Sequence, residues 1–359
     1  MGWGPKRLWC SPLWLALALA ACKPGDDRAP FAESRTPPQL AARFFAPDGW
    51  AWGYLQLDDG PVQRYGVSAP PVAPAADILI LPDYGETAET WFETARDLNA
   101  RGFSVWVLEG VGQGGSQRTA SPRDLGHVAS FDGDVAAVGA MARSVIRPRR
   151  SLVLLGQGTG AVIAARAAER GLMAEGLILS APVFAPPVRD RSFLARAPGL
   201  SERRASGGGA WRHRDAFAAG LTHDPWRGGV TVAWQGANPD LRMGGPSVRW
   251  TDAYRGLANA ARRDLRLLPM PTLVLEGRGA QGCRTAPVCE ARSWPAAGRS
   301  LELEGEPIRA AWLGAVASFV NARALKQHPP GESAFQGRSA PIAFAPTIRP
   351  APKGGDSSQ

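Results

Sequence analysis

The stretch from Gly156 to Ala161 is the part of this sequence best suited to chemistry. It reads Gly-Gln-Gly-Thr-Gly-Ala and joins an apolar run at 151–156 to a helical pattern at 159–170. A glycine-rich turn between a strand and a helix can bind a dinucleotide pyrophosphate at the helix N-terminus. The same arrangement can be a nucleophile elbow, in which Gly-x-Ser-x-Gly exposes a serine above a sheet.

The two interpretations make different demands on the rest of the chain. A dinucleotide site needs an acid about twenty residues further on, to hold a ribose. The next apolar run instead ends Leu179-Ser180-Ala181, and the turn lies far from the first strand–helix unit. The elbow interpretation fits Gly156 and Gly160, but its nucleophile position is Gly158. We therefore expect an elbow-shaped turn without its nucleophile, and no bound cofactor.

Short apolar runs alternate with helical patterns along the chain, which predicts an α/β fold with a mostly parallel sheet covered on both faces. The expected strands are 77–82, 103–109, 151–156, 176–182, 272–277 and 300–305. The expected helices are 87–101, 129–146, 159–170 and 307–324.

The first residues, 1–21, have the pattern of a bacterial lipoprotein signal peptide. Lys6 and Arg7 precede an apolar run at 13–20, and the cleavage motif Leu-Ala-Ala-Cys ends at Cys22. The run is too short to span a bilayer. We expect cleavage before Cys22 and lipidation of its thiol, which would anchor the protein to a membrane of the cell envelope, facing the periplasm. An ordinary signal peptide with a chance cysteine is the alternative.

The remaining chain divides by composition. Residues 22–38 are expected to be a polar tether, 39–325 a single α/β domain, and 326–359 a disordered Pro-rich tail. Within the domain, 184–260 is rich in Arg, Gly and Trp with poor periodicity, which predicts a cap inserted between two sheet strands.

Charge and histidine content restrict the partners. The formal net charge is +9, and loss of Lys6 and Arg7 with the signal peptide would leave two fewer positive charges. The arginines are spread along the sequence, so anionic lipid headgroups are a conceivable partner, whereas no motif supports nucleic-acid binding. The histidines are scattered without metal-ligand spacing, so no metal is expected. Cys283 and Cys289 form an isolated pair that favours a local disulfide in an oxidising compartment.

Several separated motifs carry a family resemblance. The segment "ILILPDYGETAETWFETARDLNARGFSVWVLEGVGQGGS", with "GHVASF", "LTHDP" and "NPDLRMGGPSVRW" further on, resembles the lysophospholipase and monoacylglycerol-lipase-like branch of the α/β-hydrolases. The resemblance runs from about Phe44 to Phe319. It implies an α/β-hydrolase fold, a Ser–Asp–His triad in that chain order and an oxyanion hole of backbone amides.

The positions that the resemblance assigns to the triad hold unsuitable residues. The nucleophile position is Gly158, the acid falls on Gly279 or Ala280, and the base falls on Arg299 or at most Ser300. Arginine cannot act as a base at neutral pH. The oxyanion-turn positions are Asp83, Tyr84 and Thr159, with Asp83 where the family has glycine; a carboxylate facing the pocket would repel an oxyanion.

The sequence therefore predicts a catalytically degenerate α/β-hydrolase, retained as a membrane-tethered binding or scaffolding lipoprotein, with a lipid-like ligand as a candidate. The alternative is an active lysophospholipase or esterase that uses non-standard groups, such as Thr159 as nucleophile with a cap histidine. His223, next to Asp224 in the cap, is either that relocated base or a structural side chain.

Overall fold

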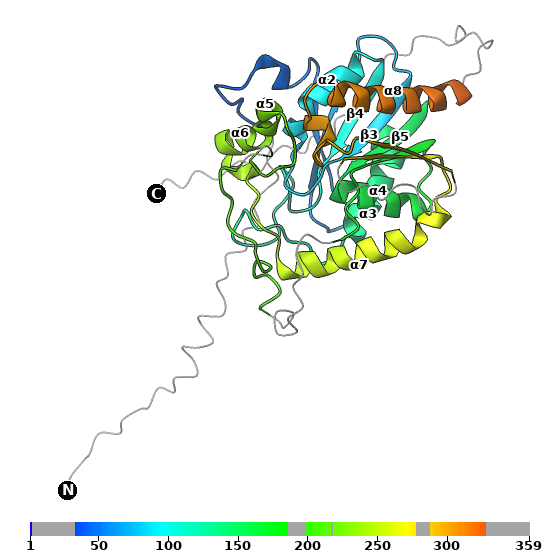
Figure 1. Ribbon diagram of the computed structural model, residues 1–359. Coiled ribbons are helices and arrows are strands. Elements are labelled where there is room, and N and C mark those ends of the chain that lie inside the picture. The colour runs from blue at the N-terminus through cyan, green and yellow to red at the C-terminus, as the bar shows by residue number, and fades with distance from the viewer. Residues whose placement is uncertain (2–32, 186–198, 215, 217, 278–287, 328–359) are drawn as a thin grey trace, which may run out of the picture.

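The fold is built on one eight-stranded sheet (Figure 1). The computed structural model describes Met1 and residues 33–185, 199–277 without 215 and 217, and 288–327. The strands are β1 Ala51–Leu55, β2 Gln63–Ser68, β3 Ala76–Leu81, β4 Phe103–Leu108, β5 Ser151–Gln157, β6 Gly176–Ser180, β7 Thr272–Glu276 and β8 Cys289–Ser293. Their order across the sheet is β1-β2-β4-β3-β5-β6-β7-β8.

From β4 to β8 every neighbouring pair is parallel, whereas β1 and β2 add an antiparallel margin beside β4. The central strands are buried along their whole length, as expected of a parallel sheet covered on both faces. In β3, Ile78 and Ile80 face one apolar core, and Leu79 and Leu81 face the other. The predicted fold class and five of the six predicted strands are thereby confirmed.

Helices cover both faces of the sheet (Figure 1). One face packs against α2 Phe92–Asn99 and α8 Ile308–Gln327. The other packs against α3 Asp132–Ala140, which continues as one π-helical segment to Ile146, and against α4 Thr159–Glu169 and α7 Val248–Asp264. Each of the four predicted helical stretches contains a helix.

The predicted strand at 300–305 is wrong. Its alternating leucines and glutamates match a strand's period of two, but both Leu301 and Glu302 are buried, and Leu301–Leu303 forms a single 3-10 turn. This segment pairs with the stretch before α5, since the Ser300 amide donates to the Leu221 carbonyl. The last strand of the sheet is instead β8, whose mostly exposed side chains give no apolar signal.

The stretch between β6 and β7 contains short helices, α5 Pro225–Gly228 and α6 Val230–Ala237, followed by the long helix α7. Helix α7 packs along α4 and covers the sheet (Figure 1). The expected cap at 184–260 therefore ends inside a helix of the main body. We keep the cap as a proposal for the part before α7.

The expected signal peptide, Cys22 and nearly all of the tail lie outside the described residues. The last part of the expected tether is attached to the body, because the Arg35 amide donates to Asn238 Oδ1 and Asn238 Nδ2 donates back to the Arg35 carbonyl. Among the described helices, none is both long and apolar enough to cross a membrane.

Candidate functional site

The turn between β5 and α4 has the conformation of an elbow. Gly158 lies at φ +54° and ψ −111°, a backbone conformation that residues with a Cβ rarely adopt. A Cβ at Gly160 would overlap the Leu81 carbonyl, and a Cβ at Gly156 would overlap the start of α4. The glycines therefore let α4 approach β3 and β5 closely, which is the geometry that the elbow interpretation requires.

The Asp83 carboxylate occupies the mouth of this elbow. Asp83 follows β3, which lies beside β5 in the sheet. Its Oδ1 accepts the backbone N–H of Tyr84 at 2.7 Å and that of Thr159, the first residue of α4, also at 2.7 Å. These are the amides that the family resemblance assigns to an oxyanion hole. A carboxylate oxygen of the chain itself thus fills the point where they converge, at the N-terminus of α4.

Gly158 and Asp83 fit each other sterically. A Cβ built on Gly158 would overlap the carboxyl carbon and both oxygens of Asp83. The observed conformation of Asp83 therefore requires that residue 158 has no side chain.

Arg299 completes the arrangement from the other side of the turn. Its Nη2 donates to Asp83 Oδ2 at 3.2 Å, and its carbonyl accepts Gln157 Nε2 at 3.1 Å. The Arg299 side chain is 44% exposed, whereas that of Asp83 is 9% exposed. Asp83 and Arg299 thus form one ion pair, although they lie far apart in the chain. Both occupy positions at which the sequence predicts loss of the family's site residue.

Two further acids, which the sequence gave no reason to select, lie beneath this pair. Glu86 Oε2 accepts the Asp83 amide at 3.0 Å and Trp91 Nε1 at 3.1 Å. Burial and the nearby Asp83 raise the pKa of Glu86 to about 7. Burial and the proximity of Glu86 raise the pKa of Glu302 well above its ordinary value. The only sequence signal was the local excess of acids at 83–89 and 302–306.

An aromatic wall stands beside the elbow. Trp250 and Tyr254 of α7 are stacked with centroids 5.0 Å apart. Tyr84 meets Trp250 edge-on at 4.8 Å, and Phe131 meets both α7 rings. These side chains join the oxyanion turn to the long helix of the main body.

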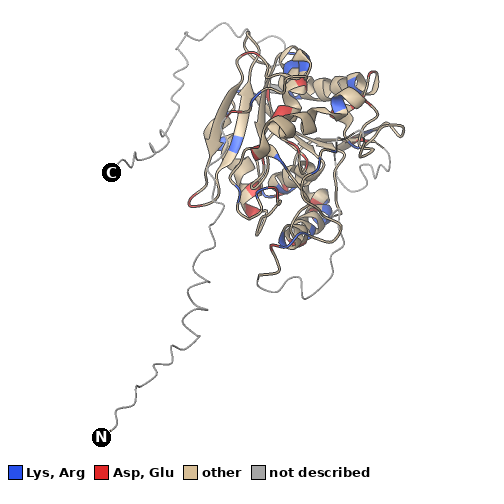
Figure 2. Ribbon diagram, turned by 90° about the vertical axis from the view of Figure 1, so that its left-hand side faces the viewer, with Lys and Arg blue, Asp and Glu red and all other residues tan. Residues whose placement is uncertain are grey.

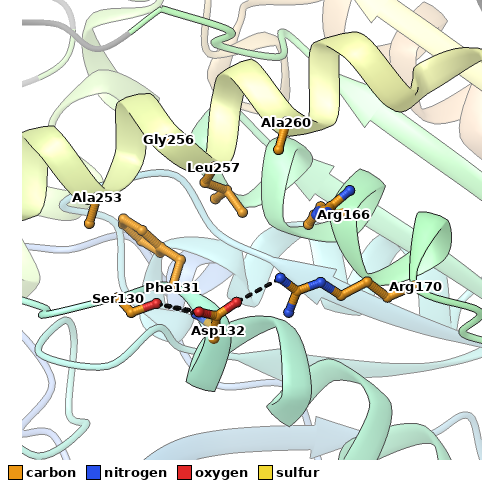
Figure 3. A pocket seen from close by; sticks show the side chains of 9 residues that line it. All are labelled: Ser130, Phe131, Asp132, Arg166, Arg170, Ala253, Gly256, Leu257 and Ala260. Carbon is orange, nitrogen blue, oxygen red and sulfur yellow. Dashed lines mark hydrogen bonds and ion pairs between the residues drawn. The ribbon is translucent and has the colours of Figure 1, made fainter.

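The described pocket lies on the outer side of this wall, not over Gly158. It has a volume of about 250 Å³ and lies between the start of α3, the second half of α4 and the middle of α7 (Figure 3). Phe131 and Leu257 provide apolar surface, and Arg170 reaches across to Asp132 at 2.7 Å. Its charges are already paired, and its volume is smaller than that of most ligand sites.

Other predicted residues have these positions. Gly279, Ala280 and Cys283 lie outside the described residues. Cys289, the first residue of β8, is disulfide-bonded, but its pairing with Cys283 stays a prediction. Thr159 is buried, and His223 pairs through Nδ1 with Glu304 at 3.0 Å. Over the described ranges, no contact joins Thr159 to His223, and no group of His, Cys, Asp and Glu is arranged to hold a metal.

Comparisons with known proteins agree with this arrangement of strands and helices. Residues 72–289, more than half of the chain, match the family described as serine aminopeptidase, S33. Lysophospholipase L2 of Escherichia coli strain K12 is 28% identical over 184 residues, which are 48% of this chain and 54% of that protein. The chain thus spans about half the length of the curated relatives it matches.

Solved structures show the same fold. A soluble variant of monoglyceride lipase from Saccharomyces cerevisiae, bound to a substrate analog, superposes with a TM-score of 0.59 at 15% identity, covering 82% of this chain and 99% of that one. A thermostable carboxyl esterase from Bacillus coagulans superposes with a TM-score of 0.57 at 16% identity, covering 77% of this chain and 99% of that one. At these identities the similarity concerns the fold alone, and it confirms the predicted α/β-hydrolase architecture.

Proposed function

We propose that this chain, which belongs to the serine aminopeptidase S33 family, is a member that binds a ligand without hydrolysing it. In this proposal it is a binding or scaffolding lipoprotein, anchored through Cys22 in the bacterial cell envelope.

The position of Asp83 Oδ1 carries the proposal. Hydrolysis of an ester passes through an oxyanion, which the family's fold stabilises with backbone amides. Here the Tyr84 and Thr159 amides already donate to a carboxylate. A second negative oxygen could not enter unless Asp83 moved away from both amides and from Arg299. The arrangement therefore favours a resting state that excludes the reaction.

The size of the catalytic loss supports the same conclusion. Loss of the triad in a serine hydrolase lowers kcat by about 10⁶. Loss of an oxyanion-hole donor lowers it by roughly a further 10²–10³. Gly158 offers no nucleophile, Arg299 offers no base, and Asp83 Oδ1 occupies the Tyr84 and Thr159 amides, so both losses apply to the elbow as the structure has it.

The names of the relatives indicate the class of ligand. A lysophospholipase and a monoglyceride lipase both act on lipids with a single acyl chain. Phe131, Trp250 and Tyr254 are buried against one another and only Tyr84 is partly exposed beside the elbow, so the choice of a single acyl chain rests on these relatives. We infer that a single-chain glycerolipid is the ligand.

The test measures binding and hydrolysis on the same sample. The full chain is incubated with radiolabelled monoacylglycerol and, separately, lysophospholipid. Protein-bound lipid is measured after gel filtration, and free fatty acid by chromatography. We expect retained lipid and no fatty acid above the protein-free control.

A fluorophosphonate probe provides the second measurement. Fatty acid release together with probe labelling, both abolished by Thr159→Ala, would establish the alternative hydrolase. Retention of neither lipid would show the proposed ligand class to be wrong.

A further inference from the structure

The loops that precede the parallel strands meet at one edge of the sheet, opposite the elbow. Because β3 to β8 are parallel, all of them begin at this edge. Backbone hydrogen bonds join these loops to one another or to the start of a neighbouring strand: Ala75 to Gly102, Glu175 to Leu152, and Thr272 to Val288. We call this surface the amino edge. In Figure 1 it lies where α7 and α8 end, away from α5 and α6.

The amino edge gathers arginines that are spread widely along the sequence. The segments that lead into β4, β5, β6 and β7, residues 100–102, 141–150, 170–175 and 262–271, include helix ends and contain only two acids, Glu175 and Asp264. The arginines in these segments are Arg101, Arg143, Arg147, Arg149, Arg150, Arg170, Arg262, Arg263 and Arg266. Three of them form ion pairs, Arg150 with Asp77, Arg170 with Asp132 and Arg263 with Asp264. Figure 2 looks onto the opposite side of the molecule, where basic and acidic segments are interspersed. The tertiary structure thus creates a basic surface that the sequence does not reveal.

Large apolar side chains project from four segments that lead into the parallel strands. Val72 precedes β3, Met173 precedes β6, Leu267 precedes β7 and Val288 precedes β8, and their exposures are 67%, 86%, 61% and 61%. Outside this edge, the described chain exposes large apolar side chains only at Met1, Tyr54 and Trp226. Single exposed apolar residues are common, but their concentration among arginines on one edge is a distinct surface property.

We propose that the amino edge binds the surface of a bilayer that contains anionic phospholipids. Guanidinium groups bind lipid phosphates in a bidentate manner, and each basic side chain near such a surface strengthens binding by about fivefold. Met173 and Leu267 would enter the boundary between headgroups and acyl chains. A nucleic acid would satisfy the arginines but would leave the apolar side chains in water, so the combined surface favours lipid.

The proposal does not depend on the expected lipid anchor or on the proposed binding function. The first described residues of the body, around Arg35, lie against Asn238 before α7, far from the amino edge. Docking through the amino edge would leave the elbow and the Asp83–Arg299 pair facing away from the bilayer.

The test is co-sedimentation of the full chain with vesicles of phosphatidylcholine alone or mixed with phosphatidylglycerol. Four exposed arginines are replaced by alanine in one variant: Arg143, Arg149, Arg262 and Arg266. None of them has a side-chain partner among the described residues, so folding should be preserved, which circular dichroism checks. We expect binding to the mixed vesicles to fall by about a hundredfold or more and to weaken with salt.

A second variant, Met173→Ser with Leu267→Ser, should weaken binding by about tenfold. The matched control removes the same number of exposed arginines elsewhere: Arg203, Arg212, Arg214 and Arg292. It should bind as the unmodified chain does, because every variant keeps the same N-terminal segment.

The proposal is wrong if the edge-arginine variant binds as well as the control variant, or if both vesicle types bind equally. It is also wrong if an oligonucleotide binds with the same arginine dependence while anionic vesicles do not.

Discussion

Asp83 and Gly158 are interlocked: the Asp83 carboxylate fills the space that any side chain at residue 158 would need. The same carboxylate accepts the Thr159 amide at 2.7 Å, directly after the glycine. A hydrolase elbow must instead leave this space to a serine and an incoming ester. The two residues together convert the elbow from an open site into one occupied by the chain itself.

Replacing Gly158 with serine alone should yield no hydrolase and should destabilise the fold. The positive φ costs roughly 1–3 kcal/mol for a residue with a Cβ, and the serine also displaces Asp83. Urea unfolding should show the loss of stability, and fluorophosphonate labelling should stay at background. Gly133→Ser in α3 is the matched control, since a Cβ there meets nothing. Labelling of the Gly158→Ser chain would reveal a base that the structure does not identify.

Replacing Asp83 with glycine should partly rescue Gly158→Ser. The serine side chain then finds room, so the double variant should be more stable than the sum of the two single variants predicts. Residues in direct contact typically show coupling energies of roughly 0.5–3 kcal/mol. A thermodynamic cycle from urea unfolding of the four chains measures this energy. Additivity within error would contradict the interlock.

Asp83→Ala should open a site for small anions. The variant frees two converging amides at a helix N-terminus and leaves Arg299 without its carboxylate partner. We expect a loss of about 1–2 kcal/mol in stability and a rise in Tm when formate or acetate is added. Asp83→Asn is the control, because its amide oxygen can still accept both N–H groups. Equal responses of the alanine variant, the asparagine variant and the unmodified chain to formate would contradict the prediction.

Stability should fall as pH rises from about 5 to about 7, and Glu86 should contribute to this fall. The pKa of Glu86 is about 7 in the folded protein and near 4.5 when unfolded. The folded state therefore binds the proton more tightly, and this stabilisation is lost as pH passes 7. Glu86→Gln keeps an acceptor for the Asp83 amide and for Trp91. With this substitution, the total loss of unfolding free energy between about pH 5 and about pH 7 should be smaller by roughly 1–3 kcal/mol.

Urea unfolding at several pH values measures this difference. The control Glu290→Gln removes an exposed carboxyl group of β8, far from Glu86 in the sheet order, and should decline with pH as the unmodified chain does. A slope in Glu86→Gln as steep as in the unmodified chain would show that Glu86 does not hold the proton.

Local features of the sequence were sufficient to predict the strands of the central sheet and the turn at Gly158. The apolar runs of β3, β5 and β7 are buried along their length, so residue type alone identified them. The strand β8 was missed because its exposed side chains carry no apolar pattern, and its pairing with β7 depends on backbone hydrogen bonds. The segment 300–305 has the opposite property: its alternating pattern is that of a strand, but its neighbours hold it outside the sheet.

The sequence by itself determined that residue 158 has no nucleophile and that residue 299 is no base, because these facts follow from residue identity. Only the tertiary structure decided where the Asp83 carboxylate points, since its partners Thr159 and Arg299 are distant in the chain. The pairing of β3 with β5 brings Thr159 near, and a hydrogen bond from Gln157 Nε2 to the Arg299 carbonyl holds Arg299 at the turn. The same holds for the amino edge, where parallel register aligns loops whose arginines are scattered in sequence. Residue type sets what a side chain can do, but long-range packing sets which groups it meets.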